Sequence, residues 1–102
     1  MQLALNTLKN WTWCSFSLTN ITKVPQVSGV YCLGKNDAVT YIGSSNNMQN
    51  RLRQHYSTTD PCIKQATQFA IEPCANYKER EKQRLREYRM KHGRLPACND
   101  LI

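Results

Sequence analysis

The chain has 102 residues, with 14 Lys and Arg against 7 Asp and Glu, and a formal net charge of +7. This length has room for one domain that buries roughly 65% of its unfolded-chain surface, and the excess positive charge favours an anionic partner, most often nucleic acid. No run of about 18 apolar residues and no basic, apolar export signal is present, so we expect no membrane span and no secretion.

The cysteines are few, odd in number and irregularly spaced. They are Cys14, Cys32, Cys62, Cys74 and Cys98. Because no CxxC pair and no Cys/His ligand spacing occurs, we expect neither a disulfide framework nor a zinc site. Cys32 is expected to be a small buried hydrophobe, and this cysteine usage indicates a reducing cytoplasm.

Residues 1–28 carry the weakest pattern. Their leucines and tryptophans predict a short helix or strand, and residues 17–23 predict a helical turn before Pro25. We expect residues 1–28 to be a cap or extension of the domain. The alternative is that Trp11 and Trp13 stack on unpaired bases.

Residues 29–43 have the pattern of a β-hairpin. Two runs of β-branched and aromatic residues flank the turn residues 34–37. Alternation along the strands places Tyr31 on one face with Leu33, and Tyr41 on one face with Gly43. With aligned register, the two tyrosines are close neighbours.

A helix is predicted from about Met48 to Tyr56, after several residues that can cap its start. Met48, Leu52 and Tyr56 form the stripe expected to face the core. Arg51 and His55 are four residues apart, so they point the same way at the border of that stripe.

The sequence after residue 56 predicts a short helix near residues 60–65, a third strand over 67–72 and a long helix over 77–91. The fold class is therefore α+β, with a small three-stranded antiparallel or mixed sheet flanked by helices. Glu81 interrupts the most apolar stripe of the long helix, whereas Glu79 and the arginines are expected on its solvated face. An inward carboxylate needs a cation, a base or a metal, although pairing with a nearby arginine remains an alternative.

Taken singly, these residues are compatible with ordinary packing and surface roles. Taken together, they resemble the GIY-YIG nuclease superfamily. The first motif is Gly29-Val30-Tyr31, the second is Tyr41-Ile42-Gly43, and an Arg-x-x-x-His pair follows as Arg51 and His55. Valine in place of isoleucine is a conservative departure. The resemblance covers residues from about 29 to 99, and we expect a nuclease core over residues 29–102.

The resemblance implies a DNA endonuclease that uses one divalent metal, Mg²⁺ or Mn²⁺. Glu81 matches the family's metal-binding glutamate, and Asn99, after a proline-containing turn, matches a less regularly spaced asparagine. The implied roles give Tyr31 the general base or proton relay, with His55 as its partner. Tyr41 would position water or phosphate.

The phosphate contact implied for the site is Arg51, with Arg53 and Lys64 as further DNA-binding residues. Gly29 and Gly43 permit close backbone approach, or else are packing positions. Two alternatives stay open: a catalytically inactive nucleic-acid-binding module of the same fold, and a basic protein-interaction domain. Target choice would require a homo-oligomer, a fused domain or a separate targeting partner.

Overall fold

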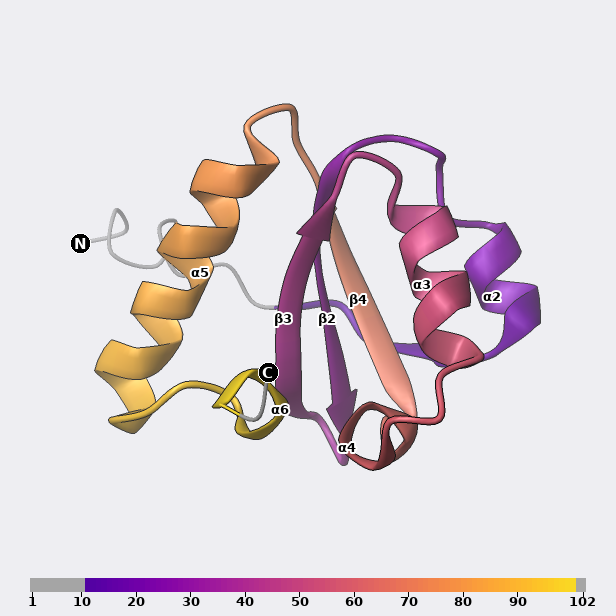
Figure 1. Cartoon of the computed structure of the whole chain (residues 1–102). Helices are drawn as coiled ribbons and strands as arrows, with labels where there is room; N and C mark the ends of the chain where they lie inside the picture. Colours follow the sequence, from indigo (N-terminus) through magenta and orange to yellow (C-terminus); the bar gives the residue numbers. More distant parts are fainter. Residues whose placement is uncertain (1–10, 101–102) are drawn as a thin grey trace.

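The computed structural model describes residues 11–100 and has an α+β architecture (Figure 1). Four strands form one antiparallel sheet in the order β1-β4-β2-β3. The strands are β1 (Cys14–Ser15), β2 (Gly29–Lys35), β3 (Ala38–Ser45) and β4 (Gln68–Pro73). The helices are α2 (Leu18–Thr22), α3 (Met48–Tyr56), α4 (Pro61–Lys64), α5 (Tyr77–His92) and α6 (Ala97–Asp100).

The sheet has one strand more than the sequence predicts. The extra strand, β1, pairs Cys14 with Phe69 and Ser15 with Gln68 at the outer edge of β4. Two residues are too few to show the alternation by which strands are recognised in a sequence, so no sequence pattern predicts this strand. The α+β fold class is confirmed, and of the two sheet arrangements that the sequence left open, antiparallel or mixed, the structure has the antiparallel one.

The β2–β3 hairpin is confirmed, and its turn is tight. Lys35 pairs with Ala38, and the two turn residues, Asn36 and Asp37, have φ angles of 54° and 63°. Both angles lie in the left-handed region, where Asn and Asp are better tolerated than most residues. The turn sets the register as far as the Gly34–Val39 pair. An irregularity between Leu33 and Gly34 then shifts the pairing by one residue, so that Leu33 lies opposite Tyr41 and Tyr31 lies opposite Gly43.

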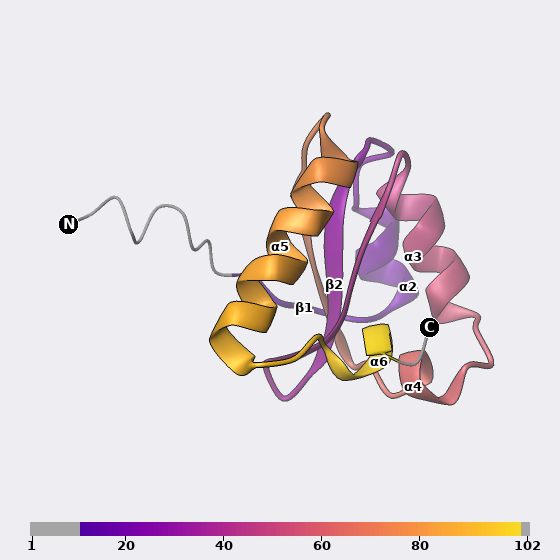
Figure 2. The ribbon, with the colours of Figure 1, turned by 60° about the vertical axis from the view of Figure 1, so that its left-hand side comes forward.

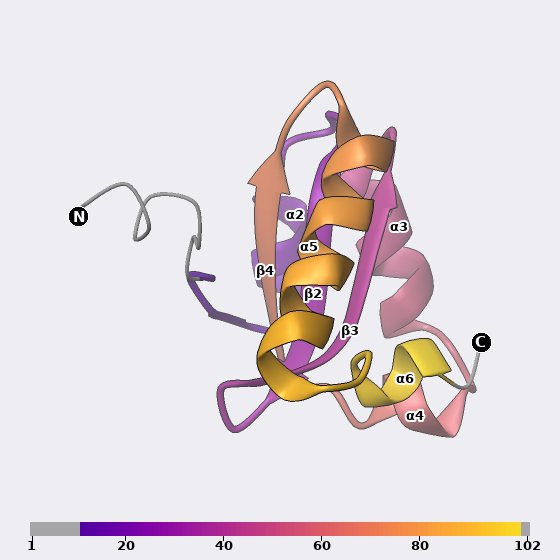
Figure 3. The same cartoon turned by 90° about the vertical axis from the view of Figure 1, so that its left-hand side faces the viewer.

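Helices cover both faces of the sheet: α2 and α3 lie on one side, and α5 runs along the other (Figures 1 and 3). Two buried clusters result. The α2/α3 face contains Ile21, Val24, Tyr31, Leu33, Met48, Leu52, Ile63, Phe69 and Cys98. The α5 face contains Val30, Cys32, Ile42 and Ala70, with Trp11, Trp13, Leu85 and Tyr88 packed against them. The packing of Trp11 and Trp13 leaves less of their rings available to stack on bases.

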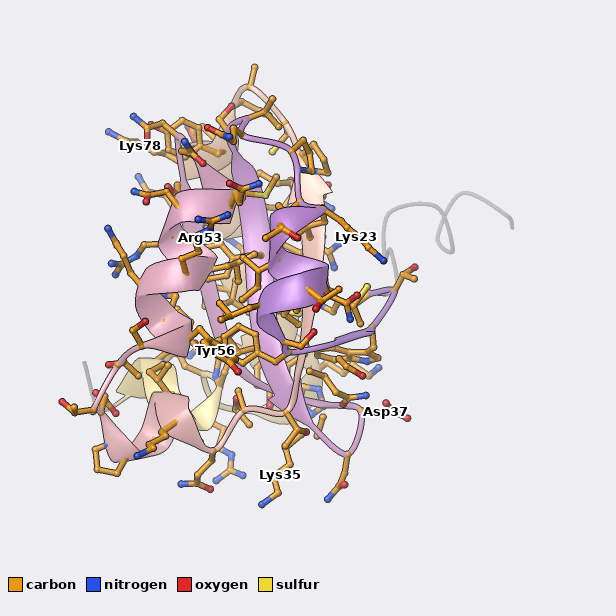
Figure 4. All side chains as sticks on the ribbon, turned by 90° about the vertical axis from the view of Figure 1, so that its right-hand side faces the viewer. Lys23, Lys35, Asp37, Arg53, Tyr56 and Lys78 are labelled. Carbon is orange, nitrogen blue, oxygen red and sulfur yellow. A yellow bond between two sulfur atoms is a disulfide. The ribbon has the colours of Figure 1, made fainter. Side chains whose placement is uncertain are left out.

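Helix α3 begins where the sequence predicts, because the Asn47 side chain accepts a hydrogen bond from Asn50 N at 3.1 Å. Met48 and Leu52 are fully buried, as expected. Tyr56 is not: it lies in the last turn of α3, is 44% exposed and makes an edge contact with Phe16 (Figure 4). The helical stripe therefore ends one turn earlier than its periodicity predicts.

The sequence predicts no disulfide framework, but one disulfide is present and joins Cys62 in α4 to Cys98 in α6. The two residues are 36 positions apart, and the fold places their Cα atoms 5.7 Å apart, with α4 and α6 side by side (Figures 2 and 3). No spacing rule connects cysteines in two short helices, so the sequence did not show the pair. Cys32 is buried and free, as expected.

In residues 11–100, no helix has the length and apolar character needed to cross a membrane.

Candidate active site

The centre of the site is a buried hydrogen bond between the two predicted catalytic elements, the hairpin and α3. The Tyr31 hydroxyl lies 2.7 Å from His55 Nε2. The Tyr41 ring lies beside both, with centroids 6.3 Å from Tyr31 and 5.4 Å from His55. The structure thus brings together three of the side chains that the motifs select.

The environment of this pair fixes the direction of the hydrogen bond. Burial and the neighbouring Tyr41 raise the pKa of Tyr31 well above its usual range, and Arg51 opposes this only in part. Burial, with a contribution from Arg51, lowers the pKa of His55 to about 4. At neutral pH, Tyr31 therefore keeps its proton, and its hydroxyl donates a hydrogen bond to Nε2 of a neutral His55. In the protein alone, burial of the Tyr31 hydroxyl therefore outweighs the opposing effect of Arg51 on its pKa.

Gly43 gives the Tyr31 hydroxyl its space. The two residues are directly opposite in the β2–β3 register. A Cβ atom at position 43 would lie 2.6 Å from the Tyr31 hydroxyl oxygen and 2.8 Å from Cε2 of Tyr41. Because real Cβ contacts are longer, any larger residue would displace a tyrosine from the site.

Gly29 has a packing role at the start of β2. A Cβ atom there would lie 2.6 Å from both the Glu72 carbonyl oxygen and the Met48 sulfur. Atoms of β4 and α3 therefore fill the space that a side chain at Gly29 would need. The close approach that Gly29 permits is the packing of these two elements against β2.

Arg51 lies at the solvent edge of the site. Its side chain is exposed, and Nη1 donates a hydrogen bond to Gln54 Oε1 at 2.8 Å. Its charge acts on both members of the pair: it partly offsets the rise in the pKa of Tyr31 and adds to the fall in the pKa of His55. The guanidinium is thus close to the tyrosine–histidine pair and open to an incoming anion.

Glu81 approaches from the opposite face of the sheet, on α5. It is half-buried, and its Oε1 accepts a hydrogen bond from the Ser44 hydroxyl of β3. Glu81 also contributes electrostatically to the pKa of Tyr31, which places its charge near the tyrosine. The inward orientation predicted from the helical stripe is observed, with serine as the neighbour.

The alternative of an arginine partner for Glu81 fails, because the nearby arginines bind another carboxylate. In the described part of the chain, the ion pairs join Glu72 of β4 to Arg80 at 2.8 Å and to Arg84 at 3.0 Å. Burial works against ionisation of Glu72, but these two arginines hold its pKa below the usual range.

Arg84 corrects the expectation of a solvated face. It is 7% exposed, and its guanidinium stacks on the Trp11 ring at 3.7 Å. The long apolar stem and flat head of arginine allow such burial when an acid and an aromatic ring are available. The sequence pattern of α5, rich in both charges, did not distinguish this residue from its exposed neighbours.

Asn99 is placed next to the second motif, but its amide is engaged with the backbone. Its Oδ1 accepts from Ile42 N, and its Nδ2 donates to Ile42 O, both at 2.9 Å. Since β3 is at the edge of the sheet, these bonds satisfy groups that no further strand covers. Asn99 therefore holds the strand segment between Tyr41 and Gly43.

The predicted DNA contacts are dispersed. Arg53 lies on the outer surface of α3 (Figure 4), and Lys64 is exposed at the end of α4. Neither takes part in the contacts that join Tyr31, Tyr41 and His55. Within residues 11–100, no three His, Cys, Asp or Glu side chains cluster in the manner of a multi-ligand metal centre.

Comparisons with known proteins agree with this geometry. The family model described as the GIY-YIG catalytic domain matches residues 27–97, more than half of the chain. No curated protein matches. A similar solved structure is the GIY-YIG N-terminal endonuclease domain of UvrC from Thermotoga maritima, a point mutant bound to its catalytic divalent cation. Its identity is 23% and its TM-score 0.60, over 70% of this chain and 87% of that one. The chain therefore belongs to the GIY-YIG catalytic domain family, and it is an endonuclease of that family.

Proposed function

We propose that the protein is a divalent-metal-dependent DNA endonuclease that hydrolyses phosphodiester bonds through a tyrosine–histidine proton relay. The observation that carries this proposal is the buried Tyr31–His55 hydrogen bond beside an exposed Arg51 and a half-buried Glu81. Phosphodiester hydrolysis needs a path for the proton of water, a cation for the phosphate and an anion to hold a metal. Tyr31 with His55, Arg51 and Glu81 would supply these three functions in turn.

The donor set fits a hard cation that keeps much of its water shell. Glu81 offers a single carboxylate with one oxygen already oriented by Ser44. Mg²⁺, and Mn²⁺ by the same oxygen preference, is commonly bound through one or two carboxylates together with water and substrate phosphate. The solved UvrC domain carries a catalytic divalent cation. When bound at Glu81, such a cation would stabilise charge on the phosphate oxygens and lower the pKa of an attacking water.

The protein side chains would then carry out two linked proton transfers, from water to Tyr31 and from Tyr31 to His55. As the oxygen of water forms a bond to phosphorus, its proton passes to the Tyr31 oxygen, while the Tyr31 proton passes to His55 Nε2. The P–O bond to the leaving group breaks at the same time, and the leaving oxygen takes a proton from solvent. Because His55 is neutral and already accepts the Tyr31 hydrogen bond, this transfer needs no rearrangement. Arg51 would bind the scissile phosphate.

The experiment that tests the proposal compares two glutamates of α5. Glu81→Gln removes the proposed metal ligand and is expected to abolish Mg²⁺-dependent cleavage of plasmid DNA, with DNA binding in Ca²⁺ nearly unchanged. Glu79→Gln, on the exposed side of the same helix, removes the same charge and is expected to be near neutral. Cleavage by the Glu81 variant at the wild-type rate would contradict the proposal.

We also propose that the isolated chain binds DNA weakly and without strong sequence preference. Arg51, Arg53 and Lys64 are exposed, as are basic residues of α5, and such side chains contact phosphates. Affinity of the order of 10⁻⁴ to 10⁻⁶ M, falling steeply with salt, is expected. Titration of random and selected duplexes across a salt series measures this. Selectivity would then come from a second copy, a fused domain or a targeting partner, with residues 1–28 as an extension of the nuclease core.

A further inference from the structure

Two consecutive residues of β3, Gly43 and Ser44, contact site residues on opposite faces of the sheet. Gly43 faces the α3 side, where it makes room for the Tyr31 hydroxyl. Ser44 pairs with Val30 in the register and so lies on the α5 side, where its hydroxyl donates to Glu81. Alternation along a strand requires this division, because successive side chains point to opposite faces.

The contact from Ser44 selects one oxygen of Glu81. Oε1 accepts the serine hydrogen bond, which limits rotation of the carboxylate about its terminal bond. A glutamate side chain that is held in one orientation before binding loses less conformational entropy when it takes up a ligand. The hydroxyl therefore prepares the carboxylate without occupying its second oxygen.

The chemical type of this neighbour matters as much as its position. A serine hydroxyl is neutral, so it brings no positive charge to Glu81, whereas an arginine partner would. The arginines one residue before and three residues after Glu81, Arg80 and Arg84, are both bonded to Glu72. The Glu72 carboxylate thus draws these two cations toward β4.

We propose that Ser44 is a positioning residue for the metal site, orienting the Glu81 carboxylate toward the divalent cation. This inference rests on the proposed function, since it concerns the same cation. Partners that orient a metal ligand typically contribute a factor of about 10 to 100 in metal affinity or activity. Ser44 would not touch the substrate or the reacting atoms.

The test uses the full chain and three variants. Ser44→Ala removes the hydroxyl, and Ser44→Thr retains it. Ser45→Ala is the matched control, because Ser45 is the next residue of the same strand and its hydroxyl bonds the backbone of Asn47 instead. Mn²⁺ binding is measured from the loss of the free-ion EPR signal, the Mg²⁺ dependence of plasmid cleavage is measured in parallel, and thermal unfolding reports stability.

The expected result is that Ser44→Ala weakens Mn²⁺ binding and raises the Mg²⁺ concentration for half-maximal cleavage by about 10-fold or more. Ser44→Thr and Ser45→Ala should remain within about twofold of the wild type. Unchanged metal dependence in Ser44→Ala would overturn the inference. So would a loss of cleavage at saturating metal with unaltered metal affinity, or a loss explained by unfolding and not restored by threonine.

The same measurements, with Glu81→Gln added as a fourth variant, separate this inference from the proposed function. If wild-type protein cleaves DNA only with metal, and Glu81→Gln abolishes this, but Ser44→Ala does not alter metal dependence, the positioning role alone is wrong. If the wild type neither binds Mn²⁺ nor cleaves DNA with Mg²⁺, the proposed function is wrong, and this inference with it.

Discussion

Replacing Gly43 by alanine tests whether the absence of a side chain opposite Tyr31 allows the Tyr31–His55 hydrogen bond to form. The new Cβ atom would lie 2.6 Å from the Tyr31 hydroxyl, so the phenol must move and its 2.7 Å bond to His55 must lengthen or break. Overpacking of a core costs about 1 to 3 kcal/mol, and loss of a hydrogen bond costs about 1 kcal/mol more. We expect the free energy of unfolding to fall by about 2 to 4 kcal/mol.

The cleavage rate of Gly43→Ala should fall by more than its loss of folding stability explains. A displacement of about 1 Å at a reacting group can cost about a hundredfold in rate. Single-turnover cleavage by Gly43→Ala, measured at a temperature where the variant is folded by circular dichroism, is therefore expected to be at least about 100-fold slower than the wild type. Urea denaturation provides the free energy of unfolding of the same samples.

Gly34→Ala is the matched control, because it introduces a comparable overlap far from the chemistry. A Cβ atom there would lie 2.5 Å from the end of the Trp13 ring and 2.7 Å from the Ala38 carbonyl oxygen. It should destabilise the fold to a similar degree but leave the cleavage rate of the folded fraction within a few-fold of the wild type. Equal rate losses in both variants, or full activity in Gly43→Ala, would refute the reasoning.

Three further outcomes are expected. Tyr31→Phe and His55→Ala should each slow single-turnover cleavage by about a hundredfold, and the double variant should be little worse, because one relay is lost in every case; additive losses would indicate separate roles. Since the pKa of His55 is lowered from 6.5 to about 4, the unfolded chain takes up its proton first as pH falls, so stability should decrease between pH 6.5 and 4 by up to about 3 kcal/mol and then level off. Urea denaturation across this range should show a weaker decrease in His55→Gln. Replacing Cys62 and Cys98 together by serine should lower the free energy of unfolding by about 4 kcal/mol by the loop-entropy estimate, while Cys14→Ser, at an exposed free cysteine, should have little effect. Thermal unfolding of the same variants without reductant checks this, and equal stability would argue against the bond.

The sequence predicted those features that depend on local pattern. The hairpin, α3 and α5 follow from alternation, helical periodicity and capping residues, and each is confirmed in the structure. Tyr31 and Tyr41 could be assigned to one face because strand periodicity is fixed. Glu81 could be recognised as inward because a carboxylate interrupted an apolar helical stripe.

Features that depend on tertiary contacts were not predicted. Glu72 gave no signal as a strand residue, because its role is defined by Arg80 and Arg84 on a helix that packs against it. The Cys62–Cys98 disulfide joins two short helices whose proximity depends on the whole fold. Periodicity measures only which residues share a face, and cannot identify the partner across an interface.

Asn99 shows that a family pattern, like periodicity, does not identify the contacts that a residue makes. The family pattern selects Asn99 as a site residue, and the structure places it beside the site, but with both amide groups bonded to the Ile42 backbone. A family motif can therefore include a residue whose observed contacts fix a strand in place. Its position in α6, next to the disulfide-bonded Cys98, anchors that contact to the rest of the fold.

Strand β3 explains how so small a domain can hold a site that spans both faces of its sheet. An edge strand with unpaired backbone groups tends to be mobile or to pair with other chains, but Asn99 satisfies Ile42 at the outer edge while β2 pairs along the inner one. The strand is thereby fixed where Gly43 accommodates Tyr31 and Ser44 bonds Glu81. Because adjacent residues of this strand contact the proposed proton relay and the proposed metal ligand, the peptide bond between them sets the relative geometry of the two contacts.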